Sequence, residues 1–127
     1  MNCFDTSALI DYLEGSEELK QVLETRENQP FFAPTVVLHE VFVGAARLRG
    51  EEGVREVRED LHWIEPLELT VDDAAEAAYM SAELSDAGTP IGSMDTLIAG
   101  ICRSSGSTLI TRDGHFDRVD DLETLTY

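Results

Sequence analysis

Four acidic residues interrupt segments of this sequence that are otherwise apolar. Asp5 follows Met-Asn-Cys-Phe, Glu40 lies within Val-Val-Leu-His-Glu-Val-Phe-Val, Asp95 precedes Thr-Leu-Ile-Ala, and Asp113 follows Thr-Leu-Ile-Thr-Arg. A carboxylate held against an apolar core is costly unless it is protonated, paired or bound to a cation. Mg²⁺ and Mn²⁺ are hard ions that prefer oxygen ligands, and such ions promote the hydrolysis of phosphodiesters. The four acids therefore predict a metal site suited to cleaving RNA or DNA.

Each acid also has an ordinary structural use. Asp5 can cap a helix, and Asp95 can favour a helix amino terminus through its charge. Glu40 can pair with Arg47 or face solvent, although glutamate is rarely buried unpaired, and Asp113 is a typical turn former. Taken one at a time, the aspartates favour the structural interpretation. The conjunction of all four favours the metal site.

Hydroxyl and guanidinium groups extend the candidate site. We expect Thr6, Ser7 and Thr111 to hydrogen-bond a ligand carboxylate or the attacking water. Guanidinium groups match the geometry of phosphate oxygens, so the candidate RNA contacts are Arg47, Arg103 and Arg112. Gly44 lies one helical turn after Glu40, and its missing side chain can leave room for a nucleic-acid backbone.

The histidines are expected to lie outside this site. They lack metal-ligand spacing with one another, and no histidine is needed as a general base because a metal ion can activate the attacking water itself. Surface or interface positions are therefore expected for His39, His62 and His115.

Short apolar runs alternate with helical segments along the chain. The pattern predicts strands at 1–4, 31–33, 63–64, 108–111 and 125–127, with Pro66 breaking the third. It predicts helices from 5 to about 15, from a Ser16 cap to Pro30, and over 35–48, 51–61, 74–87 and 94–103. Thr70 and Asp73 resemble a capping box, and Ser93 is expected to cap the last helix.

This alternation indicates a mainly parallel sheet covered by helices on both faces. Ligands of such sheets bind outside the carboxyl ends of the strands. Asp5 and Asp113 each follow a predicted strand, so they should share that rim if their strands are neighbours. The two helix acids, Glu40 and Asp95, can reach the same rim.

The composition is strongly acidic. Nine Lys and Arg oppose 26 Asp and Glu, giving a formal charge of -17, while 43% of the 127 residues are hydrophobic. This is the composition of a folded protein rather than a disordered one, and the length fits one domain over 1–127. The acidic balance resembles that of proteins from halophiles that accumulate KCl. Because the acids are spread along the chain, solvation in concentrated salt is favoured over mimicry of a nucleic acid.

No targeting or membrane-spanning segment is evident, so a cytoplasmic protein is expected. Cys3 and Cys102 lie in apolar segments without CxxC spacing. We expect both to be small buried hydrophobes rather than a disulfide or a metal site.

Four motifs together resemble a PIN-domain endoribonuclease, most closely the VapC toxins of toxin-antitoxin pairs. They are Asp5-Thr6-Ser7-Ala8-Leu9-Ile10, Glu40-Val41-Phe42-Val43-Gly44, Asp95-Thr96-Leu97-Ile98-Ala99-Gly100 and Leu109-Ile110-Thr111-Arg112-Asp113-Gly114-His115-Phe116. The resemblance implies a three-layer α/β fold with a five-stranded sheet in the order 3-2-1-4-5. It also implies RNA cleavage with Mg²⁺ or Mn²⁺, a homodimer, and a VapB-like antitoxin whose tail occupies the groove.

The same resemblance assigns the acids. Asp5, Glu40 and Asp95 match the family's three core acids and are the expected metal ligands. Asp113 matches a more variable fourth acid, and Asp117 is a rival for that place. A non-catalytic interaction module with the same fold is the alternative function.

Overall fold

The centre of the molecule is a five-stranded, all-parallel sheet, and the computed structural model describes all of residues 1–127. The strand order is β3-β2-β1-β4-β5, which confirms the expected topology. The strands are β1 (Asn2–Phe4), β2 (Phe31–Pro34), β3 (Glu65–Leu67), β4 (Thr108–Thr111) and β5 (Thr124–Thr126). β1 lies between β2 and β4, so the first and fourth strands are indeed neighbours.

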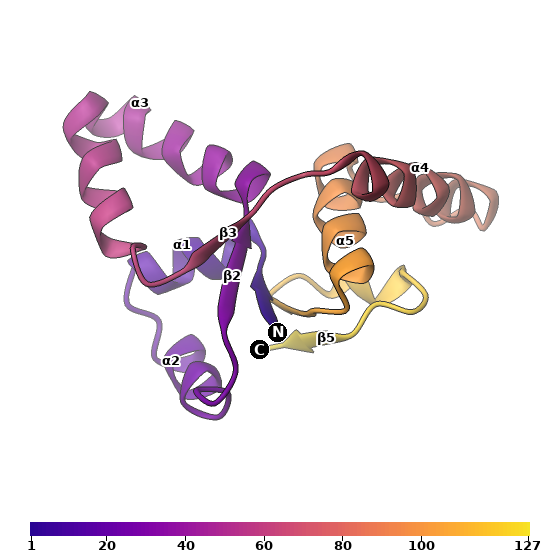
Figure 1. Cartoon of the computed structure of the whole chain (residues 1–127), viewed down its shortest axis with the longest axis horizontal. Helices are drawn as coiled ribbons and strands as arrows, with labels where there is room; N and C mark the ends of the chain where they lie inside the picture. Colours follow the sequence, from indigo (N-terminus) through magenta and orange to yellow (C-terminus); the bar gives the residue numbers. More distant parts are fainter.

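Helices cover both faces of the sheet (Figure 1). One side carries α1 (Thr6–Leu13), α2 (Glu17–Glu24) and α3 (Thr35–Asp60), and the other carries α4 (Val71–Asp86) and α5 (Ser93–Ser105). The chain proceeds outward from β1 to β3 and then returns to β4 on the far side of β1. Because crossovers between parallel strands are right-handed, this reversal places the later helices on the opposite face. None of the helices has the length and apolar character needed to cross a bilayer.

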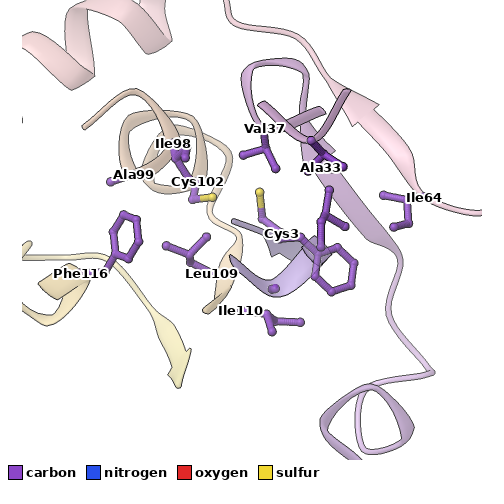
Figure 2. Packing of buried hydrophobic residues seen from close by; sticks show 14 of the residues in the cluster. Cys3, Ala33, Val37, Ile64, Ile98, Ala99, Cys102, Leu109, Ile110 and Phe116 are labelled. Carbon is purple, nitrogen blue, oxygen red and sulfur yellow. The ribbon is translucent and has the colours of Figure 1, made fainter. Parts of the chain in front are cut away.

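The core lies between the central strands and the helices on each face (Figure 2). β1 and β4 are buried along their whole length, as expected of central strands in a parallel sheet. Cys3 and Cys102 are fully buried and form no disulfide, which confirms their prediction as small hydrophobes. The hydrogen bond with the neighbouring Cys3 thiol, followed by burial, raises the pKa of Cys102, so this thiol stays protonated and unreactive.

The third strand differs from its prediction. It is Glu65–Leu67 rather than residues 63–64, and Pro66 lies inside it, paired with Ala33 of β2. β3 is an edge strand with one open side, where a proline without an N–H group is tolerated. Trp63 instead packs its ring against Phe4, Phe31 and Tyr12.

The two helices predicted over 35–48 and 51–61 are both present, as two helical segments of α3 that are separated by a sharp bend at Gly50. Gly50 causes the bend, because its φ of 62° and ψ of -147° lie outside the helical region and favour glycine. Gly53 allows the second segment to fold back closely. A Cβ atom at Gly53 would lie 2.7 Å from the carbonyl oxygen of Ala45.

Most helix termini follow their sequence signals. Ser16 caps α2, and Thr70 and Asp73 form the predicted capping box of α4. The predicted cap at Ser93 is wrong, because Ser93 lies inside α5 and Gly92 is the capping residue. α2 also ends at Glu24, before the predicted stop at Pro30, and continues as hydrogen-bonded turns.

The α4 and α5 helices cross in close contact. Gly100 makes this possible, since a Cβ atom there would lie 2.9 Å from the Cβ of Ala77. Met80 and Leu84 of α4 are buried in the core, whereas Tyr79 is 65% exposed. This crossing fixes the position of α5 and therefore of Asp95 in its first turn.

Candidate functional site

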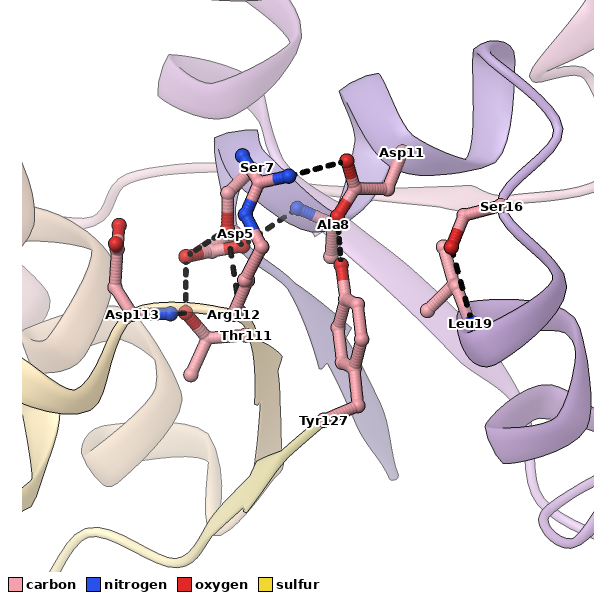
Figure 3. Close-up of polar contacts among 10 residues, drawn as sticks. All are labelled: Asp5, Ser7, Ala8, Asp11, Ser16, Leu19, Thr111, Arg112, Asp113 and Tyr127. Atoms are coloured by element: carbon pink, nitrogen blue, oxygen red, sulfur yellow. Dashed lines mark hydrogen bonds and ion pairs between the residues drawn. The ribbon is translucent and has the colours of Figure 1, made fainter.

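Asp5 occupies the carboxyl end of the central strand β1 and is only 2% exposed. Its Oδ1 accepts hydrogen bonds from the Ala8 N–H at 2.9 Å and from the Ser7 hydroxyl at 2.8 Å. Its Oδ2 accepts a hydrogen bond from the Thr111 hydroxyl of β4 (Figure 3). Asp5 is therefore the amino-terminal cap of α1, as the structural interpretation predicted, and also a buried carboxylate on the expected rim.

Burial is the main cause that raises the pKa of Asp5. The hydrogen bonds from Thr111, Ala8 and Ser7 oppose this effect because they stabilise the charged form. The negative charge of Asp113 raises the pKa of Asp5 further. Two of the predicted acids thus interact electrostatically at one point of the rim.

Two hydroxyl groups join the β1 and β4 parts of the site. Besides donating to Asp5, the Thr111 hydroxyl accepts a hydrogen bond from the Asp113 N–H at 2.9 Å. The Ser7 hydroxyl likewise accepts a hydrogen bond from the Arg112 N–H at 3.3 Å. Ser7 and Thr111 therefore hold the Asp5 carboxylate against the segment that carries Arg112 and Asp113 (Figure 3).

Glu40 reaches the same region from α3. Its Oε1 accepts a hydrogen bond from the Thr6 hydroxyl at 2.7 Å, and Thr6 directly follows Asp5. Glu40 is only partly exposed and does not form the alternative pair with Arg47. Thr6 thus orients one predicted ligand, just as Ser7 and Thr111 orient another.

Asp95 lies in the first turn of α5 and contacts His115 of the 3-10 helix η1 (Gly114–Arg118). The distance between Asp95 Oδ2 and His115 Nε2 is 2.9 Å. This contact differs from the expectation that His115 lies outside the site. The sequence offered a signal that His115 lies near the site, because His115 follows Asp113 by two residues and belongs to the same motif after β4.

The four acids do not converge on a single point. No group of three or more His, Cys, Asp or Glu side chains is close enough to hold one ion as the side chains stand. Carboxylates repel one another, and three of the four take a separate partner: Thr111 and Ser7 for Asp5, Thr6 for Glu40, and His115 for Asp95. A shared metal site remains a prediction.

Two other candidates are engaged elsewhere. Asp117, the rival fourth acid, accepts a hydrogen bond from Thr124 of β5 at 3.2 Å. Arg103 is paired with Glu76 of α4 at 2.6 Å, and its side chain is 12% exposed. Arg47 is exposed on α3. Of the three predicted RNA contacts, only Arg112 lies beside Asp5 and its hydroxyl partners.

The PIN domain family model matches residues 3–122. The chain belongs to the PIN domain family. A comparison with curated proteins gives no match.

Solved structures of toxin-antitoxin proteins share the fold of this PIN domain. VapBC2 from Rickettsia felis, bound to a DNA fragment from its promoter, matches with a TM-score of 0.90 and 20% identity, covering 99% of this chain and 98% of that chain. DNA-bound VapBC from Salmonella typhimurium matches with a TM-score of 0.87 and 23% identity, covering 98% of this chain and 96% of that chain. Mycobacterium tuberculosis VapC20, a toxin that cleaves the sarcin-ricin loop, matches with a TM-score of 0.67 and 15% identity, covering 97% of this chain and 99% of that chain.

A polar network around the buried Asp11 supports Arg112 in this PIN domain. Asp11 of α1 is 6% exposed, and its carboxylate accepts from the Arg112 guanidinium at 2.8 Å and from the Tyr127 hydroxyl at 2.6 Å. Burial, followed by the hydrogen bond to Asp11, raises the pKa of Tyr127, so its hydroxyl remains a donor. Sequence reasoning missed this network because its members lie at opposite ends of the chain.

A groove between α1 and α3 begins beside Glu40. Its volume is about 430 Å³, and its lining includes Ile10, Leu13, Gly44 and Leu48. Ile10 and Leu48 are 39% and 86% exposed, so the groove presents apolar side chains to solvent. Gly44 lies in its wall with no atom within 4 Å of the position that a Cβ would take.

Proposed function

We propose that this PIN domain is a metal-dependent endoribonuclease that hydrolyses RNA phosphodiester bonds in the cytoplasm. The observation that supports this most directly is the buried carboxylate of Asp5 at the carboxyl end of the central strand, with the charge of Asp113 beside it. Maintaining an ionised carboxylate there is unfavourable for folding alone. A divalent cation offsets that cost, and its binding is the functional reason to retain the charge.

The donor set fits Mg²⁺ or Mn²⁺, because it consists mainly of carboxylate oxygens. Asp5, Glu40, Asp95 and Asp113 would hold the ion directly or through water. When bound, such an ion supplies activation of the attacking water and charge stabilisation of the phosphate.

The protein's own groups have separate tasks. Ser7 and Thr111 orient Asp5, and Thr6 orients Glu40. The Arg112 guanidinium is 57% exposed and is the best-placed cation for a phosphate of the RNA backbone.

The partner proposed for this chain is a VapB-like antitoxin, which would make the chain the toxin of a pair. Similar solved structures are VapBC complexes, including two bound to DNA. The groove that begins at Glu40 offers the exposed apolar side chains of Ile10 and Leu48 to an antitoxin tail. A homodimer of this chain is part of the same proposal and follows from the resemblance to VapC toxins.

A cleavage assay tests the enzymatic proposal. RNA is incubated with Mn²⁺ in molar KCl, and the rate is compared for the wild type, Asp5→Asn and Asp95→Asn. We expect each variant to lose at least about 100-fold in rate, because each removes an anionic ligand. Chelation of the metal should abolish the wild-type activity, and added Mn²⁺ should restore it.

Asp120→Asn is the matched control, because Asp120 is an exposed aspartate away from the rim. Its rate should equal that of the wild type. Equal rates for all four proteins, or RNA cleavage that survives chelation, would contradict metal-dependent catalysis. Such a result would favour the alternative, a non-catalytic interaction module that keeps the PIN fold.

A further inference from the structure

We propose that Asp11 and Tyr127 are positioning residues for Arg112, and that they fix its guanidinium at the rim with one edge free to bind a phosphate of the RNA backbone. This inference rests on the proposed function, because it concerns the RNA that the PIN domain would cleave. It goes beyond that function by assigning a role to two residues outside the four acids and their hydroxyl partners.

Both carboxylate oxygens of Asp11 are used within the protein. Oδ1 accepts a hydrogen bond from Arg112 Nη1 at 2.8 Å, and Oδ2 accepts one from the Tyr127 hydroxyl at 2.6 Å (Figure 3). The Asp11 side chain is 8% exposed, whereas that of Arg112 is 57% exposed. The carboxylate is therefore shielded from an approaching phosphate, and the guanidinium is the group that the rim presents to solvent.

The Arg112 guanidinium keeps most of its donors. A guanidinium carries five N–H donors on three nitrogens, and the bond from Nη1 to Asp11 is the one hydrogen bond that this side chain makes. Nε and Nη2 have no partner, and together they form one edge of the planar group. Such an edge can donate two parallel hydrogen bonds to a phosphate. The pairing with Asp11 thus anchors the guanidinium and leaves a bidentate phosphate site.

Tyr127 is itself fixed to the strands that form the rim. Its N–H donates to the carbonyl oxygen of Thr111 at 3.3 Å, directly after the pairing of β5 with β4. Thr111 is the residue whose hydroxyl donates to Asp5. The Tyr127 side chain therefore joins the end of β5 to Asp11 of α1, beside the Arg112 guanidinium.

The anchored arginine lies on the same rim as Asp5. The Arg112 N–H donates to the Ser7 hydroxyl at 3.3 Å, and that hydroxyl donates to Asp5 Oδ1 at 2.8 Å. A long, exposed side chain normally loses conformational entropy when it binds a ligand. Because Asp11 and Tyr127 already restrict Arg112, less entropy is lost when a phosphate binds to it.

The sign of one substitution separates positioning from simple electrostatics. Asp11→Asn removes a negative charge near the RNA, so electrostatics alone predicts tighter binding. Positioning predicts weaker binding, because a neutral amide holds a guanidinium less firmly than a carboxylate does. We expect Asp11→Asn to weaken RNA binding about fivefold, and Tyr127→Phe, which removes only a hydroxyl group, to weaken it about threefold.

The test is a double-mutant cycle on RNA affinity. Binding of a short, fluorescently labelled single-stranded RNA of mixed sequence is measured by anisotropy with a chelator present, so that the RNA stays intact. Asp11→Asn and Tyr127→Phe are each made in wild type and in Arg112→Gln. Both should weaken binding when Arg112 is present and change it by less than about 1.5-fold in Arg112→Gln. Tyr79→Phe is the matched control, because Tyr79 is 65% exposed on α4 and should leave binding unchanged.

A second measurement follows the guanidinium without RNA. Nitrogen relaxation measured by NMR reports the fast motion of the Arg112 Nε–H group. The group should be rigid in wild type and Tyr79→Phe, and mobile in Tyr127→Phe and Asp11→Asn. Circular dichroism of each variant confirms that it is folded before the comparison.

The results separate this inference from the proposed function. Equal effects with and without Arg112, tighter RNA binding by Asp11→Asn, or an Arg112 guanidinium that is already mobile in wild type would each overturn the inference. A wild type that does not bind the RNA would also overturn it. In all these cases RNA cleavage by wild type with Mn²⁺ would still support the nuclease. Coupling to Arg112 in a protein that binds RNA but never cleaves it would instead support the positioning role and overturn the nuclease.

Discussion

At the scale of single residues, Asp5 combines a structural and a chemical function. It caps α1 through the Ala8 N–H, and its second oxygen meets the Thr111 hydroxyl of β4. A neutral asparagine could keep these contacts, because asparagine is an equally good cap and hydroxyl groups can reverse their donor direction. The charge of Asp5 is thus not required by the fold.

The raised pKa of Asp5 gives a pH-dependent prediction. The folded state favours the protonated carboxyl, so wild type loses stability as the pH rises from about 3.9, the unfolded value, through the folded pKa. In chelator-treated buffer at pH 7, Asp5→Asn should therefore melt a few degrees higher than wild type. A change of about 1 kcal/mol in the free energy of unfolding typically gives a shift of this size. The difference should shrink as the pH falls toward about 4.

Thermal melting monitored by circular dichroism between pH 4 and pH 8 checks this prediction. Asp120→Asn, which removes an exposed charge, should stay within about 0.5 kcal/mol of wild type. Saturating Mn²⁺ should raise the melting temperature of wild type more than that of Asp5→Asn, because only a bound ligand stabilises the folded state. A melting temperature of Asp5→Asn below that of wild type at pH 7 would show that the charge itself supports the fold.

At the scale of elements, the site depends on how α5 is placed against the sheet. Asp95 lies in the first turn of α5, and the contact of Gly100 with Ala77 sets the distance between α5 and α4. The position of Asp95 therefore depends on how α4 and α5 pack together and not on either helix alone. The rim lies where β1 and β4 end. Because the last turn of α5 leads directly into the start of β4, the first turn of α5 lies toward the other end of β4, at the rim.

Gly100→Ala tests this crossing. A Cβ atom would lie 2.9 to 3.0 Å from atoms of Ala77, which is too close without movement of a helix. We expect a loss of about 1–3 kcal/mol in the free energy of unfolding, measured by urea denaturation. The matched control is Gly44→Ala on α3, where nothing lies within 4 Å of the added atom.

Gly44→Ala should stabilise the protein by up to about 1 kcal/mol, because alanine is the better helix former. The two substitutions are chemically identical, and we predict that they change the free energy of unfolding in opposite directions. A Gly100→Ala protein as stable as wild type would mean that α4 and α5 separate freely, and that their contact does not fix Asp95.

At the scale of the whole molecule, the charge of -17 dominates the behaviour in solution. Exposed acids repel one another, and the repulsion acts over a Debye length of about 10 Å at 0.1 M salt and about 3 Å at 1 M. The same repulsion opposes the approach of RNA. The exposed Arg112 guanidinium and the cation must overcome it locally.

We predict that KCl stabilises this protein strongly. The melting temperature should rise between 0.1 and 1 M KCl, where the Debye length falls from about 10 Å to about 3 Å, and then level off. A variant in which Glu51 and Glu52 on exposed α3 are replaced by glutamine should melt higher than wild type at 0.1 M and gain less from added salt. A melting temperature that is flat over this range, or that rises only above 1 M, would contradict charge screening as the cause.

Sequence alone determined the features that depend on neighbouring residues. The α/β alternation, the helix caps at Asp5 and Ser16, and the capping box of Thr70 and Asp73 were all predicted, because such contacts join residues within one turn. The strand order was predicted from the resemblance to PIN domains. The acids at the ends of β1 and β4 were predicted because strand ends are visible in the hydrophobic pattern.

Tertiary structure decided what joins distant segments. Thr6 and Glu40 are separated by 34 residues, Arg112 and Asp11 by 101, and Tyr127 and Asp11 by 116. It also placed the edge strand β3 at Glu65–Leu67, around Pro66, and brought His115 against Asp95. Local propensity carries no information on such pairs, because their geometry follows from how the helices pack on the sheet, which depends on the volume and shape of the whole core.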